Sequence, residues 1–183
     1  WEYPTFAEDD GTSPPSSSSQ DYVEQDRGFV ASINVADPAN IVPVERETIR
    51  SGALHIHVST SAIFAAGADY NSNTGDSTTR VQYIDISDPA GAITPRGTFN
   101  VPGSIRNRFY MDEFNGSFRI CTDNWGFGFR AAKLFTYNVT NPDAVTAQGN
   151  VEIIRGEILE AVRYDGNRAY AVTFLRVDPL FII

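Results

Sequence analysis

YIDISDP, residues 83–89, decides the fold because near-copies of this run occur on either side of it, as SINVADP at 32–38 and TYNVTNP at 136–142. In each copy two apolar residues frame Asp or Asn, and a short turn closes on Pro. The closing prolines lie 51 and 53 residues apart. A repeat of this length indicates that the chain is built from copies of one supersecondary unit.

The sequence around these copies is typical of short β-strands. From residue 28 onward, runs of Val, Ile, Phe, Tyr and Thr alternate with clusters of Gly, Pro, Asn and Asp. Asn-Gly at 115–116 and Asp-Gly at 165–166 predict tight hairpins. No window shows a sustained helical period. The predicted strands are 28–35, 44–49, 54–58, 62–68, 80–87, 95–101, 105–112, 117–123, 133–139, 147–154, 159–165, 168–175 and 180–183.

About fifty residues and four strands per unit are the dimensions of a β-propeller blade. We therefore expect an all-β chain that forms part of a β-propeller. Two complete four-stranded blades are predicted at 54–101 and 105–154, with partial blades at each end. The chain stops in the apolar run DPLFII (178–183). An unpaired apolar strand is an aggregation hazard, so we expect further sequence, another chain or a swapped element to cover it.

Stacking of blades face to face explains why single strands are apolar on both sides. In the strand that leads into residues 83–89, Val81 and Tyr83 should point one way and Ile84 and Ile86 the other. The turn that follows should be closed by a side chain, because Asp and Asn accept hydrogen bonds from the backbone two residues on. Asp88 and, in the next unit, Asn141 occupy this position.

The formal net charge of −9 is concentrated in residues 1–26, which hold seven acidic residues and no Lys or Arg. Residues 13–19 are all Ser or Pro, so we interpret 1–26 as a linker or tail and 27–183 as the propeller blades of a longer protein. No basic patch of the kind that nucleic acid requires is present, and no apolar run reaches the roughly 20 residues of a membrane-spanning helix. Three aromatic residues of the tail are candidates for contact with a partner: Trp1, Tyr3 and Phe6.

The final third of the chain resembles a known family. GEILEAVRYDGNRAYAVTFLRVDPLFII (156–183) and GSIRNRFYMDEFNGSFRICT (103–122) resemble an uncharacterised family of secreted proteins with a C-terminal β-propeller domain. The matching positions are Gly156, Glu157, Ile158, Val162, Arg163, Gly166, Ala169, Tyr170, Val172, Thr173, Phe174, Asp178, Pro179 and Leu180. Tyr164 and Asn167 stand where the family usually has Phe and Asp. The resemblance implies a propeller fold, a location outside the cell and a longer chain, and it carries no information about chemistry.

Two stretches contain candidate metal ligands. His55 and His57 lie two apart on a predicted strand, so both rings should face one side, but no further His is available to complete a metal site. The run DYNSNTGDS (69–77) places oxygen ligands in an alternating pattern, as in calcium loops. These ligands are Asp69, Asn71, Asn73 and Asp76. Because the glycine falls one place late and no Glu follows, a polar hairpin loop without cofactor is the favoured interpretation, with calcium as the alternative.

The remaining candidates are surface features. Asn115 and Asn138 begin glycosylation sequons, and Asn115 should be the better acceptor because it lies in a tight turn. The loop NWGFGF (124–129) carries Trp125, Phe127 and Phe129, which either contact a partner or seal the gap between blades.

No nucleophile elbow, HExxH run or phosphate-binding loop occurs. From the repeat, the Ser/Pro-rich tail and the family resemblance, we expect a non-catalytic extracellular or cell-surface propeller that acts as an interaction or structural module. Its partners would be other proteins or further copies of the same chain. Two alternatives stay open: a subunit of a surface filament or tube, and a propeller hydrolase with its site in the central funnel.

Overall fold

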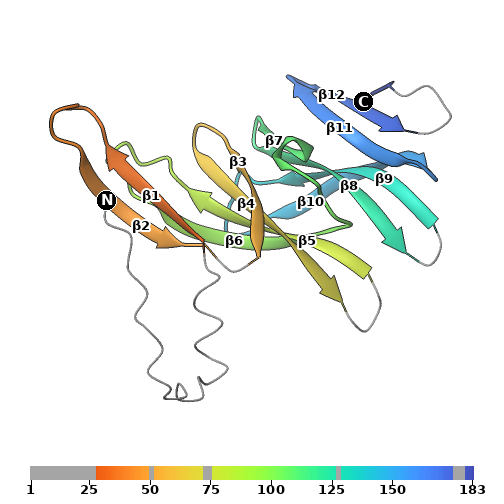
Figure 1. Ribbon diagram of the computed structural model, residues 1–183, viewed down its shortest axis with the longest axis horizontal. Coiled ribbons are helices and arrows are strands. Elements are labelled where there is room, and N and C mark those ends of the chain that lie inside the picture. Colours follow the sequence, from red (N-terminus) through yellow and green to blue (C-terminus); the bar gives the residue numbers. More distant parts are fainter. Residues whose placement is uncertain (1–27, 50–51, 72–75, 127–128, 175–179) are drawn as a thin grey trace, which may run out of the picture.

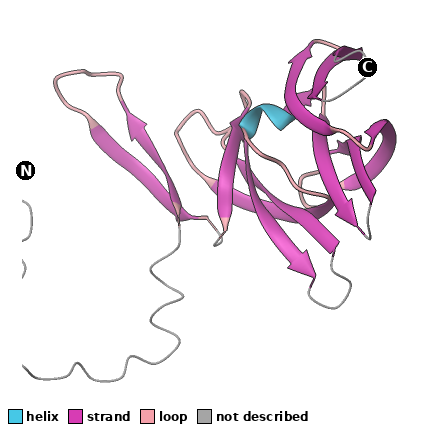
Figure 2. Cartoon of the chain, turned by 45° about the vertical axis from the view of Figure 1, so that its right-hand side comes forward, coloured by secondary structure: helices cyan, strands magenta, loops and turns pink. Residues whose placement is uncertain are grey.

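The computed structural model describes residues 28–183 except 50–51, 72–75, 127–128 and 175–179. The described residues form an all-β fold of thirteen strands and one short 3-10 helix (Figures 1 and 2). The elements are β1 (Phe29–Asn34), β2 (Val42–Thr48), β3 (Ala53–Val58), β4 (Ala62–Asn71), β5 (Asp76–Asp85), β6 (Thr94–Pro102), η1 (Arg108–Tyr110), β7 (Met111–Phe114), β8 (Ser117–Gly126), β9 (Phe129–Asn138), β10 (Thr146–Arg155), β11 (Ile158–Asp165), β12 (Arg168–Phe174) and β13 (Leu180–Ile182). Within the described residues, no helix is long and apolar enough to cross a membrane.

The strands form four antiparallel sheets that follow one another across the molecule in chain order (Figure 1). Two complete sheets, β3-β4-β5-β6 and β7-β8-β9-β10, lie in the middle. The pair β1-β2 precedes them, and the three-stranded sheet β11-β12-β13 follows them. The two predicted four-stranded units and the partial units at each end are therefore confirmed. The described sheets do not close into a ring.

One predicted strand is wrong. Residues 105–112 were expected to be extended, but residues 108–110 form η1, and β7 begins only at Met111. The reason is local, because the Asn107 side chain accepts a hydrogen bond from the backbone N–H of Phe109 at 2.9 Å and caps this turn. An Asn side chain that bonds the nearby backbone competes with strand formation.

The repeated Asp/Asn-Pro turns occupy one equivalent place in three sheets. They connect β1 to β2, β5 to β6 and β9 to β10. In each turn, the side-chain oxygen accepts a hydrogen bond from the backbone N–H two residues on, at 3.0 Å for Asp37, 2.8 Å for Asp88 and 3.2 Å for Asn141. The predicted capping by Asp88 and Asn141 is thus confirmed. The sequence repeat marks the link between the third and fourth strands of each unit.

The core lies between the sheets. Where the β3–β6 sheet faces the β7–β10 sheet, the Phe64 and Phe118 rings stack with their centroids 4.5 Å apart. The buried residues of this interface are Ala62, Phe64, Ala66, Val81, Tyr83, Val101, Met111, Phe118, Ile120, Tyr137 and Val139. Ile84 packs on the opposite face, with Ile63 and the partly buried Ile86, toward β1-β2. The predicted division of the strand at 81–86 between two faces is therefore confirmed.

A third interface joins the β7–β10 sheet to β11–β13. The buried Tyr110 hydroxyl donates to the carbonyl of Leu159 at 2.6 Å, and the Tyr164 hydroxyl donates to the carbonyl of Tyr110 at 3.1 Å. Cys121 and Val162 are buried in the same cluster. Because these bonds cross from one sheet to the next, they fix the two sheets relative to each other.

Cys121 gives a direct test of this interface. Burial raises the pKa of its thiol to about 11 from a usual 9.0. At pH 8 the native protein should therefore hold about 100-fold less thiolate than a free cysteine, and thiolate is the reactive species. We expect reaction with Ellman's reagent at pH 8 to be at least that much slower before denaturation than after it. Equal rates in the folded and denatured protein would show that this interface is not formed.

Candidate functional site

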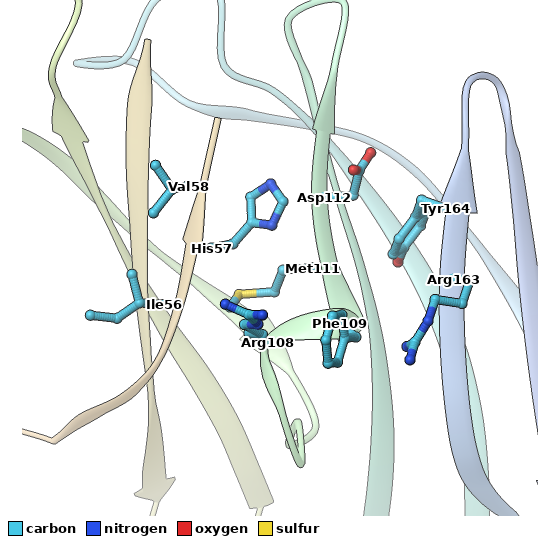
Figure 3. A pocket seen from close by; sticks show the side chains of 9 residues that line it. All are labelled: Ile56, His57, Val58, Arg108, Phe109, Met111, Asp112, Arg163 and Tyr164. Carbon is cyan, nitrogen blue, oxygen red and sulfur yellow. The ribbon is translucent and has the colours of Figure 1, made fainter. Parts of the chain in front are cut away.

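The described residues contain a pocket of about 310 Å³ along the first strands of three consecutive sheets (Figure 3). Strands β3, β7 and β11, together with η1, supply its walls. The lining residues are Ile56, His57, Val58, Arg108, Phe109, Met111, Asp112, Arg163 and Tyr164. The pocket thus exists only because the three sheets stack, since no single sheet supplies more than part of it.

Two arginines flank one aromatic ring in this pocket. The guanidinium carbons of Arg108 and Arg163 lie 4.9 Å and 4.1 Å from the centroid of Phe109. Arg163 also donates through Nη1 to the carbonyl of Val162 at 2.7 Å. Among the described residues, neither guanidinium forms an ion pair with a carboxylate. This part of the pocket is therefore positively charged.

The one carboxylate of the pocket wall is already paired. Asp112 accepts hydrogen bonds from Arg119 through Nε, at 3.0 Å, and through Nη2. Arg119 is held in place by a further bond from Nη1 to the carbonyl of Gly166 at 2.7 Å and by the Tyr164 ring, 5.0 Å away. The negative charge of Asp112 is consequently compensated before any ligand enters.

His55 and His57 face the same side of β3, as predicted. They lie opposite Ala66 and Phe64, whose side chains pack toward the β7–β10 sheet. Burial is the main cause that lowers the pKa of His57 below 6.5, and Arg108 lowers it further, whereas the charges of Asp112 and Glu113 raise it. Burial at this position therefore favours the uncharged form of His57.

The described residues contain no cluster of three or more His, Cys, Asp or Glu that could hold a metal ion. Of the four residues of the calcium hypothesis, Asp69 forms an ion pair with Arg80 at 2.6 Å. Asn71 lies opposite Asp76 where β4 and β5 pair as a hairpin. Asn73 lies outside the described residues, so calcium binding at this connection stays a prediction.

The sequon asparagines differ in environment. Asn115 is exposed in the β7–β8 turn with a φ of 52°, whereas Asn138 ends β9 and is half-buried. The Asn138 side chain accepts hydrogen bonds from the backbone N–H and the hydroxyl of Thr140, at 3.0 and 2.7 Å. Their glycosylation stays a prediction.

Most of the predicted interaction aromatics cannot be placed. Trp1, Tyr3, Phe6 and Phe127 lie outside the described residues. For Trp125 in β8 and Phe129 in β9, the structure describes only the backbone, in which the two strands pair. Contact between these residues and a partner therefore stays a prediction.

Arg108, Phe109 and Asp112 were not among the predicted site residues, and Arg163 and Tyr164 were named only as positions of the family resemblance. These residues carry no linear motif. Their common signal is position, because they lie in or just before the first strand of consecutive repeat units.

The described sheets are antiparallel, have up to four strands each and stack in chain order, which is the architecture of a β-propeller. The chain matches the family model described as "Beta propeller domain" over residues 4–183 and belongs to that family. An uncharacterized protein of Methanocaldococcus jannaschii is 34% identical over 83 residues, which are 45% of this chain and 13% of that protein. An uncharacterized protein of Archaeoglobus fulgidus is 32% identical over 94 residues, which are 48% of this chain and 13% of that protein.

The matched part of this chain thus spans about an eighth of the length of each of these relatives. No solved structure matches the chain significantly.

Proposed function

We propose that this chain is a non-catalytic interaction module, located outside the cell, whose last sheet packs against a further β-sheet. The observation that carries the proposal is the outward face of β12 and β13. Val172 lies opposite Leu180, and Tyr170 lies opposite Ile182, so their side chains share one face. The exposed large apolar residues on this face are Val172, Phe174, Leu180 and Ile182. Exposed apolar patches of this kind mark interaction sites.

The preceding sheets show what fits such a face. On β4, Phe64 points toward the next sheet and is buried there by Phe118. On β8, Cys121 points toward the next sheet and is buried with Val162. On β12 the inward residues are buried in the same way, whereas Phe174 on the outward side is 66% exposed. A sheet of the same kind is therefore the occupant that continues the series.

Two further observations bear on the proposal. The relatives are much longer than their matched regions, so additional sheets of the same protein are one source of the occupant, and a second copy of this chain is another. A filament subunit would use the same face. The extracellular location rests on the family resemblance described above.

The funnel hydrolase has less support. Asp112, the carboxylate of the pocket wall, accepts a hydrogen bond from Arg119. The described lining residues include no nucleophile that is paired with a general base.

Sedimentation velocity on the isolated chain tests the proposed docking face. In the isolated chain, only other copies of the same chain can cover the docking face. We therefore expect the chain to associate as its concentration rises from about 1 to 100 μM, which spans the dissociation constants of weak protein contacts. Phe174→Asp should keep the chain at its 20.1 kDa monomer mass. Tyr70→Asp is the control, because Tyr70 is 65% exposed on β4 and lies outside the face.

Two results would refute the proposal. In the first, the unaltered chain stays monomeric throughout this range. In the second, Tyr70→Asp and Phe174→Asp weaken association equally.

A further inference from the structure

The first sheet, β1-β2, lies at the opposite end of the stack from β11–β13 (Figure 1). One face of β1 packs on the β3–β6 sheet, where Val30 joins the apolar cluster and the Ser32 hydroxyl donates to the carbonyl of Gly91 at 2.6 Å. Successive side chains of a strand point to opposite faces, so Phe29 and Ile33 point outward. Both of these side chains are more than half exposed.

The repeat identifies the counterparts of Ile33 in the next two sheets. Near the end of each third strand, an Asn or Asp side chain accepts a hydrogen bond from the backbone N–H two residues on, at 2.9, 2.9 and 3.0 Å, which marks equivalent positions. These side chains belong to Asn34, Asp85 and Asn138. The residues just before them are Ile33, Ile84 and Tyr137.

In the second and third sheets, this position is covered by the sheet before it. Ile84 is buried in the cluster that joins the β3–β6 sheet to β1-β2. Tyr137 is buried against the β3–β6 sheet, with its ring centroid 4.9 Å from that of Phe99. Ile33 holds the same position, has no sheet before it among the described residues, and is 55% exposed. The outward face of β1 therefore has the form of a surface that a preceding sheet covers.

The two ends of the stack thus carry complementary halves of one kind of interface. Val35, just after β1, extends the exposed apolar face of the first sheet, whereas its counterpart Val139 is buried against the β3–β6 sheet. The outward face of β12 and β13, where Phe174 and Leu180 are exposed, is of the kind that a following sheet covers. A first sheet placed on a last sheet would repeat the contact that successive sheets make within the chain.

We propose that copies of this chain associate head to tail, with the outward face of β12 and β13 of one copy packed on the outward face of β1 of the next copy. This inference rests on the docking face of the proposed function and assigns its partner. The contact joins two different faces and leaves one of each free, so it continues into a ring where the rotation between copies closes and into a filament where it does not. Arg46, whose guanidinium carbon lies 3.9 Å from the Phe29 centroid, would supply part of the polar rim around the apolar contact.

Sedimentation velocity on two variants and their mixture tests the direction of association. Ile33→Asp places a carboxylate on the outward face of β1, and Phe174→Asp does the same on β12, where burial of an unpaired charge is unfavourable. Because every head-to-tail contact needs one face of each kind, each variant alone should stay at the 20.1 kDa monomer mass at about 100 μM. The equimolar mixture should form a complex of two chains that grows no further, since it retains one compatible pair of faces.

Val42→Asp is the matched control on the first sheet. Val42 is exposed but lies opposite Asn34, and it therefore points to the other face than Ile33. This variant should associate like the unaltered chain. Phe29→Asp, at the far end of the outward face, repeats the test independently and should also form a two-chain complex when it is mixed with Phe174→Asp.

Association of Ile33→Asp and Phe29→Asp at the strength of the unaltered chain would overturn the head-to-tail inference and leave the docking face in place, since two last sheets would then pack on each other. Mixtures that stay monomeric, although the variants keep the circular dichroism of the unaltered chain, would overturn the inference as well. Failure of the proposed function gives a different result, because Phe174→Asp would then associate like the unaltered chain.

Discussion

Phe64→Ala is expected to lower the free energy of unfolding by about 3–5 kcal/mol, the usual cost of emptying a buried aromatic site. Phe64 is fully buried in the first complete interface between sheets. It stacks on Phe118 and meets the edge of Tyr83, with centroids 4.5 and 5.1 Å away. Truncation removes both ring contacts and leaves a cavity between two sheets that cannot easily close. Urea denaturation followed by circular dichroism measures the loss.

Phe174→Ala is the control for this measurement. Phe174 belongs to the outward face of β12 and is 66% exposed, so its truncation in dilute protein should cost less than about 1 kcal/mol. Equal losses for the two variants would contradict the stacked arrangement, because Phe64 would then be no more buried than Phe174.

Gly103→Ala is expected to lower the free energy of unfolding by about 2–5 kcal/mol, from two causes that add. Gly103 has a φ of +89°, which L side chains rarely adopt. In addition, a Cβ there would lie 2.7 Å from the Thr122 Oγ1 and 2.8 Å from the backbone oxygen of Asp123. Since a backbone atom cannot move aside easily, the β6–β7 connection would have to shift. Thermal and urea denaturation both report this change.

The repeat itself supplies matched controls. Gly52 and Gly156 occupy the equivalent position in the neighbouring units, 51 and 53 residues away, with φ of +89° and +85°. Among the described residues, nothing lies within 4 Å of a Cβ added at either of them. Their replacement by Ala should therefore cost only the backbone strain, about 1–2 kcal/mol. If Gly103→Ala costs no more than these two, the close approach of Thr122 and Asp123 is wrong.

The repeat made the sheets predictable, because each unit carries its own local signals. Tight turns such as Asn115-Gly116 and the capped Asp/Asn-Pro turns are set by side chains only a few residues apart, and such signals can be read along the chain. The one wrong strand, at 105–112, has an equally local cause in Asn107, whose side chain caps η1. Asn also occurs in strands and in turns, and the sequence alone does not decide which of these structures forms at this position.

The pocket could not be predicted, for the opposite reason. His57, Phe109 and Arg163 are separated by about one repeat each and meet only because three sheets stack at a particular offset. The ion pair between Asp112 and Arg119 is local by contrast, because the predicted Asn115-Gly116 hairpin places the two residues directly opposite each other. The contacts across the sheets depend on tertiary packing, to which no local pattern corresponds. The outward face of β12 could not be predicted for the same reason, since Val172 and Leu180 become neighbours only through strand pairing.

Hydrogen–deuterium exchange on the associated chain tests the central claim, that another sheet covers the outward face of β12 and β13. We predict that amides of residues 168–174 and 180–182 exchange about tenfold or more slowly in concentrated than in dilute protein, because a covered face opens less often. Amides of β4, already enclosed between two sheets, should not change. Exchange in β12 and β13 that is independent of concentration, or protection that arises on β1 and β2 instead, would contradict the account.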